Sequence, residues 1–76
     1  MANLPSLPSD EIIAAFSKFG FEEVRVHSSH HVLKKPGHRY LLSVPVHGND
    51  PVAKGTFRAL LRGAGISTQE FLEKLD

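Results

Sequence analysis

The chain has 76 residues with nine Lys and Arg, eight Asp and Glu, no Cys and a formal net charge of +1 at pH 7. This length suits one small domain, residues 1–76, with a single core. The lack of cysteine excludes a disulfide framework and a thiolate zinc site, which favours a cytoplasmic protein. Apolar runs span only a few residues, and residues 1–8 lack the basic start and apolar helix of a signal, so we expect neither secretion nor membrane insertion.

The charges are distributed unevenly although their total is nearly balanced. The acidic residues fall mostly in residues 10–23 and 70–76, whereas residues 25–62 hold seven Lys and Arg against one acidic residue, Asp50. The middle of the chain is therefore basic. A net charge of +1 is still small for a protein that binds nucleic acid through bulk electrostatics.

The first predicted element is a helix over residues 10–19. Ser9 is its expected N-cap, and Asp10 and Glu11 suit the positive end of a helix. Gly20 is expected to end it. An apolar stripe gives this helix a buried side, and it consists of Ile12, Ile13, Phe16 and Phe19.

Three strands are predicted next. Residues 23–27 alternate strictly, residues 30–33 form a second run, and residues 39–46 resume after the turn signal at residues 34–37. Consecutive strands with short connections predict an antiparallel meander. In the third strand we expect one buried and one solvated face. The buried face would hold Tyr40, Leu42, Val44 and Val46, and the other face Arg39, Ser43 and His47.

The phase of the middle strand is left open, because the adjacent residues Val32 and Leu33 must point to opposite faces. After a turn at residues 48–51, apolar residues recur at helical spacing over residues 54–64, and glycine ends the pattern. Residues 67–70 have the form of a capping box for a last short helix. Its buried side would hold Phe71, Leu72 and Leu75, and that of the preceding helix Phe57, Leu60, Leu61 and Ala64.

The element order αβββαα predicts an α+β two-layer domain. Its three-stranded antiparallel sheet would carry the helices on one face. This is the shape shared by double-stranded-RNA-binding modules.

Four of the five histidines lie in two segments on the predicted strands, at His27, His30, His31 and His47. Imidazole titrates near neutrality, so a group of histidines indicates proton transfer, metal or phosphate. The spacing His27-x-x-His30 raises the case of zinc. We predict no metal, because neighbouring strand side chains diverge and neither Cys nor a nearby carboxylate completes a tetrahedral set.

Five segments of the chain occur in the same order and at the same spacing as the motifs of a known protein family. They are Gly20-Phe21, Ser29-His30-His31, residues 44–49, residues 54–62, and Ala64-Gly65-Ile66 leading to Glu70-Phe71-Leu72. Together they resemble the HicA-type toxins, the small RNA-cleaving partners of bacterial HicA/HicB toxin–antitoxin pairs, over about nine tenths of the chain. The family usually has Gly-Ser-His where this chain has Ser28-Ser29-His30. This departure bears on the loop, because serine resists a positive φ that glycine accepts.

The resemblance implies an endoribonuclease that cleaves mRNA without metal or cofactor. A HicB-like antitoxin would cover the active site, and we expect a monomer when free and a hetero-oligomer with antitoxin. The family's catalytic histidine falls on His30. Each scissile phosphate of RNA has a 2′-hydroxyl beside it, so a neutral imidazole that removes its proton can start the attack without a metal.

The remaining site candidates surround this histidine. Lys34, Lys35 and Arg39 flank the hairpin and would face phosphate oxygens. The leaving 5′-oxygen needs a proton, for which His31, His47 or water could serve. His31 is expected on the opposite face of its strand, as a supporting residue, and His47 at the end of the third strand. The last candidate is Ser29, which could orient the catalytic histidine or contact phosphate.

Lys54, Arg58 and Arg62 stand at i, i+4 and i+8 and form a basic stripe on the predicted second helix. The stripe is either a solvated face or a contact for RNA phosphates or for an acidic patch of the antitoxin. Two alternatives to the ribonuclease are kept. One is a non-catalytic RNA-binding domain of the same shape, and the other is an antitoxin-binding module whose site is disabled by Ser28.

Overall fold

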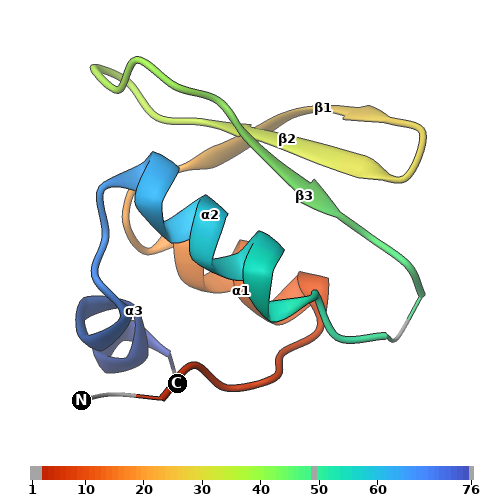
Figure 1. Ribbon diagram of the computed structural model, residues 1–76. Helices are drawn as coiled ribbons and strands as arrows, with labels where there is room; N and C mark the ends of the chain where they lie inside the picture. Colours follow the sequence, from red (N-terminus) through yellow and green to blue (C-terminus); the bar gives the residue numbers. More distant parts are fainter. Residues whose placement is uncertain (1–2, 49, 76) are drawn as a thin grey trace.

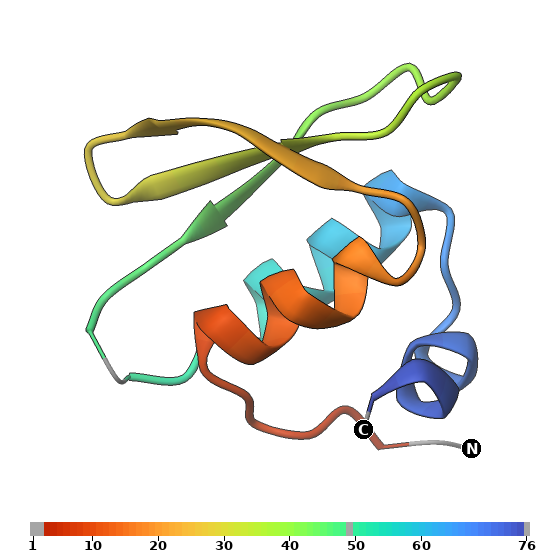
Figure 2. The same cartoon turned by 180° about the vertical axis from the view of Figure 1, so that it is seen from behind.

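The computed structural model describes residues 3–48 and 50–75. Its elements are α1 (Ser9–Ser17), β1 (Glu22–His27), β2 (His30–Lys34), β3 (Leu42–Pro45), α2 (Lys54–Ala64) and α3 (Thr68–Lys74). The strands form one antiparallel sheet in the order β1-β2-β3. Both views show α1 and α2 beneath one face of the sheet and α3 farther away, below them (Figures 1 and 2). The predicted α+β two-layer fold and its αβββαα order are confirmed.

Helix α1 begins one residue earlier than predicted, at Ser9. Its N-cap is Pro8, whose carbonyl oxygen accepts hydrogen bonds from the N–H groups of Glu11 and Ile12 at 3.2 Å each. The prediction that Ser9 is the N-cap is therefore wrong. Pro8 already has the extended backbone of a cap, and Ser9 is helical and only 3% exposed. Gly20 follows the helix with a φ of +97°, as expected of a glycine stop.

The core lies between the sheet and the helices and is built on aromatic rings. Phe16 meets Phe21 and Phe71 edge to face, with ring centroids 5.8 and 5.3 Å apart. Phe57 meets Phe71 in the same way at 5.0 Å. Burial of such side chains is the main stabilising contribution in a domain of this size. The sheet adds Leu33, Leu42 and Val44, each 3% exposed or less.

The register settles the phase of the middle strand. Leu33 pairs with Leu42 and faces the core, whereas Val32 pairs with Ser43 on the opposite face. These two side chains are nevertheless both buried, with exposed fractions of 0% for Leu33 and 7% for Val32. In β1 the pairing shifts between Glu23 and Arg25, so the strict alternation read from the sequence is interrupted there.

Strand β3 is shorter than the predicted residues 39–46. Leu42 and Val44 are buried as expected, but Tyr40 lies before the strand and is 59% exposed, so its place on the buried face is wrong. The reason is His38, whose Nε2 lies 2.7 Å from the Gly63 carbonyl oxygen and whose ring packs against Phe21. His38 therefore occupies the edge of the core. Val46 is also outside the strand and half-buried.

The loop after β3 returns the chain to the helical layer. Of the expected turn at residues 48–51, Asn49 lies outside the described residues. The His47 carbonyl oxygen accepts the N–H of Asp50 at 3.1 Å, and the Leu7 carbonyl oxygen accepts the N–H of Val52 at 2.9 Å. The segment before α1 thus supports this loop from below.

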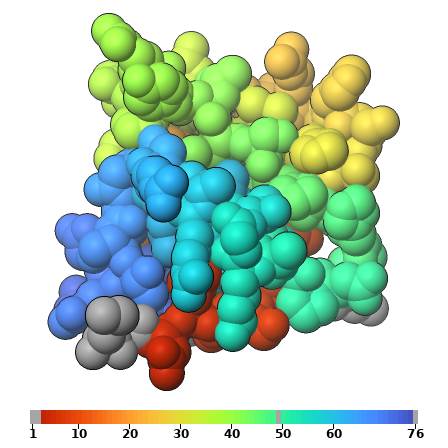
Figure 3. Space-filling view, viewed as in Figure 1, coloured from red at the N-terminus to blue at the C-terminus, as the bar shows by residue number. Residues whose placement is uncertain are grey.

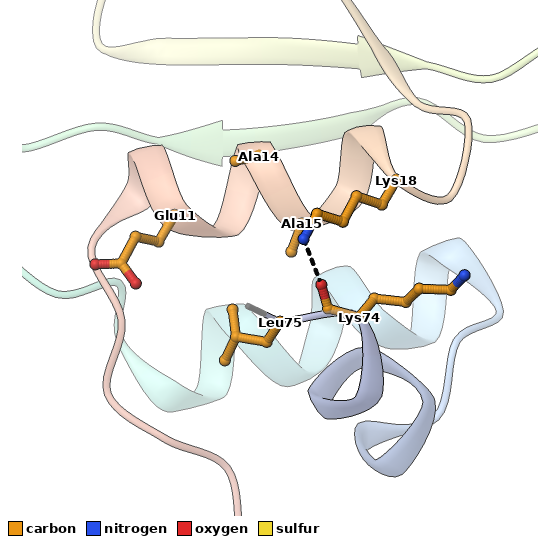
Figure 4. Close-up of a pocket in the computed structure, with 6 residues that line it drawn as sticks. All are labelled: Glu11, Ala14, Ala15, Lys18, Lys74 and Leu75. Atoms are coloured by element: carbon orange, nitrogen blue, oxygen red, sulfur yellow. Dashed lines mark hydrogen bonds between the residues drawn. The ribbon is translucent and has the colours of Figure 1, made fainter.

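The predicted second helix is confirmed as α2, and Gly65 after it has a φ of +73°. The capping box of α3 is also present. The Ser67 Oγ accepts the Glu70 N–H at 3.1 Å, and the Glu70 Oε1 accepts the Ser67 N–H at 2.8 Å. The Lys18 Nζ donates to the Lys74 carbonyl oxygen at 2.9 Å and ties α3 to α1 beside a hollow of about 190 Å³ (Figure 4). Among the described helices, none has the length and apolar character to cross a membrane.

Candidate functional site

The site is organised by the two-residue turn Ser28-Ser29 between β1 and β2. Ser28 has a φ of +57° and is the one non-glycine residue in the described ranges with a positive φ. Two-residue hairpin turns need such a conformation, and glycine usually supplies it. In serine it costs about 1–2 kcal/mol. In this hairpin a serine therefore has a backbone conformation that glycine adopts more readily.

His30 stands directly after this turn, at the start of the central strand. It is exposed, and its strand neighbours are His27 on β1 and Pro45 on β3. The Ser29 carbonyl oxygen accepts the Val46 N–H at 2.6 Å, which ties the turn to the end of β3. The half-buried Ser29 thus holds the position of the histidine through its backbone.

The face of the sheet turned away from the helices is open, and it carries one hollow, which a second hollow adjoins at the edge strand β3. The first measures about 390 Å³ and is lined by Arg25, His27, His30, Val32, Leu41 and Ser43. The second measures about 600 Å³ and extends from His30 to the loop after β3 and to Thr56 on α2. His30 and Ser43 line both hollows, so the histidine lies where they meet.

His27 lies directly opposite His30 in the β1–β2 register. The expectation that these two side chains diverge is wrong, because a two-residue turn makes the flanking residues cross-strand partners on one face. Their Cβ atoms are about 4.5–5.5 Å apart in such a pair. The sequence analysis gave His27 no catalytic role, although the two-residue separation of the predicted strands was the signal for this pairing.

Arg25 is the second residue that sequence reasoning missed. It precedes His27 by two positions and pairs with Val32, so it shares the open face and lines the first hollow. Its guanidinium carries a permanent charge whose planar donors match phosphate geometry. The alternation of residues 23–27 contained this signal.

His31 lies on the other face, as predicted. Its Nδ1 is 2.5 Å from the Glu23 Oε1, and both side chains are partly exposed, at 28% and 40%. The structure therefore does not bring His31 together with His30. His47 is different, because it is exposed and lines the second hollow with His30 and Asp50.

The three cations proposed near the hairpin lie at the far end of the sheet. Lys34 shares the face of His30 but is four residues along β2, about 13 Å away, and stands opposite Glu22. The Lys35 Nζ lies 5.7 Å from the centre of the Phe21 ring, and this side chain is half-buried. Arg39 is exposed in the loop before β3. None of the three lines either hollow beside His30.

The basic stripe is present on the surface of α2. Lys54, Arg58 and Arg62 are all exposed, and no acidic residue stands in the first turn of the helix. The stripe spans about 12 Å along the axis. In the space-filling view α2 forms the middle of the visible face directly below β3, with the loop after β3 beside its first turn (Figure 3).

Acidic groups play little part near the hollows. Asp50 lines the second one, and in the described ranges no three His, Asp or Glu side chains gather as a metal ion would need. A resolved shift of pKa is found far away, on α3. There the hydrogen bonds from the Ser67 backbone N–H and side chain hold the pKa of Glu70 below its usual value.

Comparison with protein families assigns the chain. A family model described as the HicA toxin of bacterial toxin–antitoxin systems matches residues 9–66, from the start of α1 to just beyond the end of α2. A search of curated proteins gave no match. The matched range includes the hairpin, the open face of the sheet and the basic stripe, and it covers most of the chain. The chain belongs to the HicA family of toxins from bacterial toxin–antitoxin systems.

Proposed function

We propose that this toxin is a metal-independent endoribonuclease that cleaves mRNA in the bacterial cytoplasm, with His30 as its general base. The observation that carries the proposal is the position of His30, exposed where two hollows meet on the open face of the sheet. A hollow on each side gives room for the nucleotides that flank a scissile phosphate. A buried structural histidine would have neither the exposure nor the space.

The chemistry follows from RNA itself. Neutral His30 takes the proton of the 2′-hydroxyl, and the 2′-oxygen attacks the adjacent phosphorus. A positioned base contributes about 10²- to 10⁴-fold to the rate. The remaining acceleration would come from cations that face the phosphate oxygens and from fixed orientation of the substrate. No metal is needed for the 2′-oxygen to reach phosphorus.

Cations on the open face would supply the electrostatic part. Arg25 lines the same hollow as His30 and would contact the scissile phosphate. Lys34, and beyond it Lys35 and Arg39, lie about 13 Å or more from the histidine and would contact phosphates farther along the strand. Salt dependence of RNA affinity would report these contacts.

The partner of the toxin would be a HicB-like antitoxin that covers the open face and forms a hetero-oligomer with the otherwise monomeric chain. The stripe of Lys54, Arg58 and Arg62 is exposed along α2, the helix that contributes Thr56 to the second hollow. An acidic patch of the antitoxin would fit it. RNA phosphates are the competing ligand of the stripe. A variant with Lys54→Ser, Arg58→Ser and Arg62→Ser tests the two ligands. If it still cleaves RNA but no longer binds antitoxin, the result supports the antitoxin as the ligand of the stripe.

The proposal is tested by comparing wild type, His30→Ala and Val26→Ala on an added RNA in EDTA, together with cell growth after induction. Val26 is the matched control. It lies on the adjacent strand β1, where it pairs with His31, it is 53% exposed, and its side chain points to the other face of the sheet. We expect cleavage and growth arrest with wild type and the control, and neither with His30→Ala.

Other outcomes would select the alternatives. Equal RNA loss with wild type and His30→Ala would overturn the catalytic assignment, and loss of wild-type activity in EDTA would overturn metal independence. RNA that stays intact but binds both proteins would favour a non-catalytic RNA-binding domain. Neither binding nor cleavage would favour a module that only binds antitoxin.

A further inference from the structure

We propose that His27 is the general acid of this site, the group that protonates the leaving 5′-oxygen while His30 deprotonates the 2′-hydroxyl. The inference rests on the proposed ribonuclease function. It starts from the register, in which His27 and His30 are the last pair before the turn, and from the hollow that both side chains line. Both residues are exposed, so their rings are accessible to a substrate.

The geometry of the pair matches what the reaction needs. In an in-line displacement the attacking and leaving oxygens lie on opposite sides of phosphorus, so the base and the acid must be separate groups that flank one phosphate. Two histidines on adjacent antiparallel strands have Cβ atoms about 4.5–5.5 Å apart and project from the same face. Their rings can therefore reach the two sides of one phosphate.

The step balances without any further reactant. His30 removes the 2′-hydroxyl proton, the bond from the 2′-oxygen to phosphorus forms, and the bond from phosphorus to the 5′-oxygen breaks. His27 gives its proton to the departing 5′-oxygen. The products are a 2′,3′-cyclic phosphate and a 5′-hydroxyl, with His30 protonated and His27 neutral. Exchange with water restores both histidines.

The other histidines on the sheet are placed less well for this role. His31 points to the helical side and contacts Glu23. His47 lines the second hollow but lies beyond the end of β3, two residues after Pro45. By contrast, His27 is fixed in a strand opposite His30. The pairing therefore favours His27 over both.

The groups that face His27 define what its protonation depends on. On its own strand Arg25 lies two residues away on the same face, and on β2 its partner is His30. Ser43 of β3 and Leu41 line the far side of the hollow and carry no charge. Among the described residues no carboxylate lines this hollow, so we expect the pH dependence of the reaction to report the two histidines.

The test uses the full chain and two substrates with different leaving groups. One is a short oligoribonucleotide, and the other is uridine 3′-(4-nitrophenyl phosphate), whose leaving group is a weak base that departs without a proton. The variants are His27→Gln, His30→Gln, His47→Gln and the strand control Val26→Gln. Thermal melting by circular dichroism verifies that each variant is folded.

We expect His27→Gln to lower cleavage of the oligoribonucleotide by about 100-fold or more and cleavage of the nitrophenyl ester by less than about 10-fold. His30→Gln should lower both. The pH–rate profile of wild type should fall on both sides of an optimum, and His27→Gln should remove the fall on the alkaline side. These readouts would not change if His27 had only a structural role.

Three results would overturn the inference. They are equal losses on both substrates for His27→Gln, no loss relative to Val26→Gln, or a leaving-group-dependent loss in His47→Gln instead. Failure of the underlying function looks different, because wild type and His30→Gln would then be equally inactive or equally active on both substrates.

Discussion

The two faces of the sheet differ in almost every property that matters to this protein. The face toward the helices is built from Leu33, Leu42 and Val44, which are buried against aromatic rings. The opposite face has no covering layer in the described structure and carries histidine, arginine and serine around two hollows. His30 and His31 are neighbours in sequence, yet they belong to different faces. In this domain one layer stabilises the fold and leaves the other face free for chemistry.

The largest expected effect is on the helical face. Phe16→Ala removes a fully buried ring that contacts Phe21 and Phe71. Such a truncation costs about 3–5 kcal/mol. A chain of this length has a total stability of about 4–11 kcal/mol, so the variant should be largely unfolded at 37 °C. Thermal melting by circular dichroism measures this, and a melting temperature equal to that of wild type would contradict the described core.

The next effect separates the near and far cations of the open face. Arg25→Ala should lower kcat/KM for RNA by about 10- to 100-fold, because a charge-assisted hydrogen bond contributes about 1.5–3 kcal/mol. Lys34→Ala lies at the other end of β2 and should change kcat/KM only a few-fold. Both residues are exposed, so neither variant should alter the melting temperature. Equal losses in the two variants would remove the distinction between them.

A smaller effect is expected at the turn. Ser28→Gly should stabilise the protein by about 1 kcal/mol, because glycine adopts a positive φ without the penalty that serine has. Cleavage should be retained, since the hairpin already has this conformation. The matched control is Ser29→Gly, where φ is not positive and no gain is expected. Equal melting temperatures for Ser28→Gly and wild type would contradict the assigned conformation.

The smallest effect lies in the helical layer, at the capping box of α3. The pKa of Glu70 is lower in the folded state than its unfolded-state value of about 4.5. The ionised carboxylate therefore stabilises the fold at a pH above the unfolded-state pKa. This stabilisation is lost as the pH falls through the folded-state pKa. The stability difference between wild type and Glu70→Gln should therefore be present at neutral pH and shrink in acid. Urea unfolding at several pH values measures it. RNA cleavage at neutral pH should not change, and a difference independent of pH would rule out this linkage.

Much of the fold could be predicted from local sequence signals. The helical spacing of apolar residues predicted α2, and glycine residues predicted the ends of two helices. The pattern of Ser67 and Glu70 predicted the capping box of α3. These signals work because they depend on neighbours within one turn of helix. Tyr40 was misplaced because its position depends on a distant contact, between His38 and the Gly63 carbonyl group.

The site was predictable in part. His30 was predicted as the catalytic residue from the family resemblance, and the two-residue turn could have predicted that His27 lies beside it. The contact between the Lys35 ammonium group and the Phe21 ring could not be predicted from the sequence, because these residues meet only after β2 packs near the end of α1. Cross-strand partners and cation–aromatic contacts are properties of the folded sheet.

The comparison between the two faces is tested most directly by the rate of RNA cleavage in EDTA for His30→Ala and His31→Ala, measured side by side. The same substitution is made at adjacent positions, and the two side chains lie on opposite faces of the sheet. We expect His30→Ala to lose at least about 100-fold in rate and His31→Ala to lose no more than a few-fold. Equal losses in both variants, or a larger loss in His31→Ala, would contradict a catalytic site on the open face.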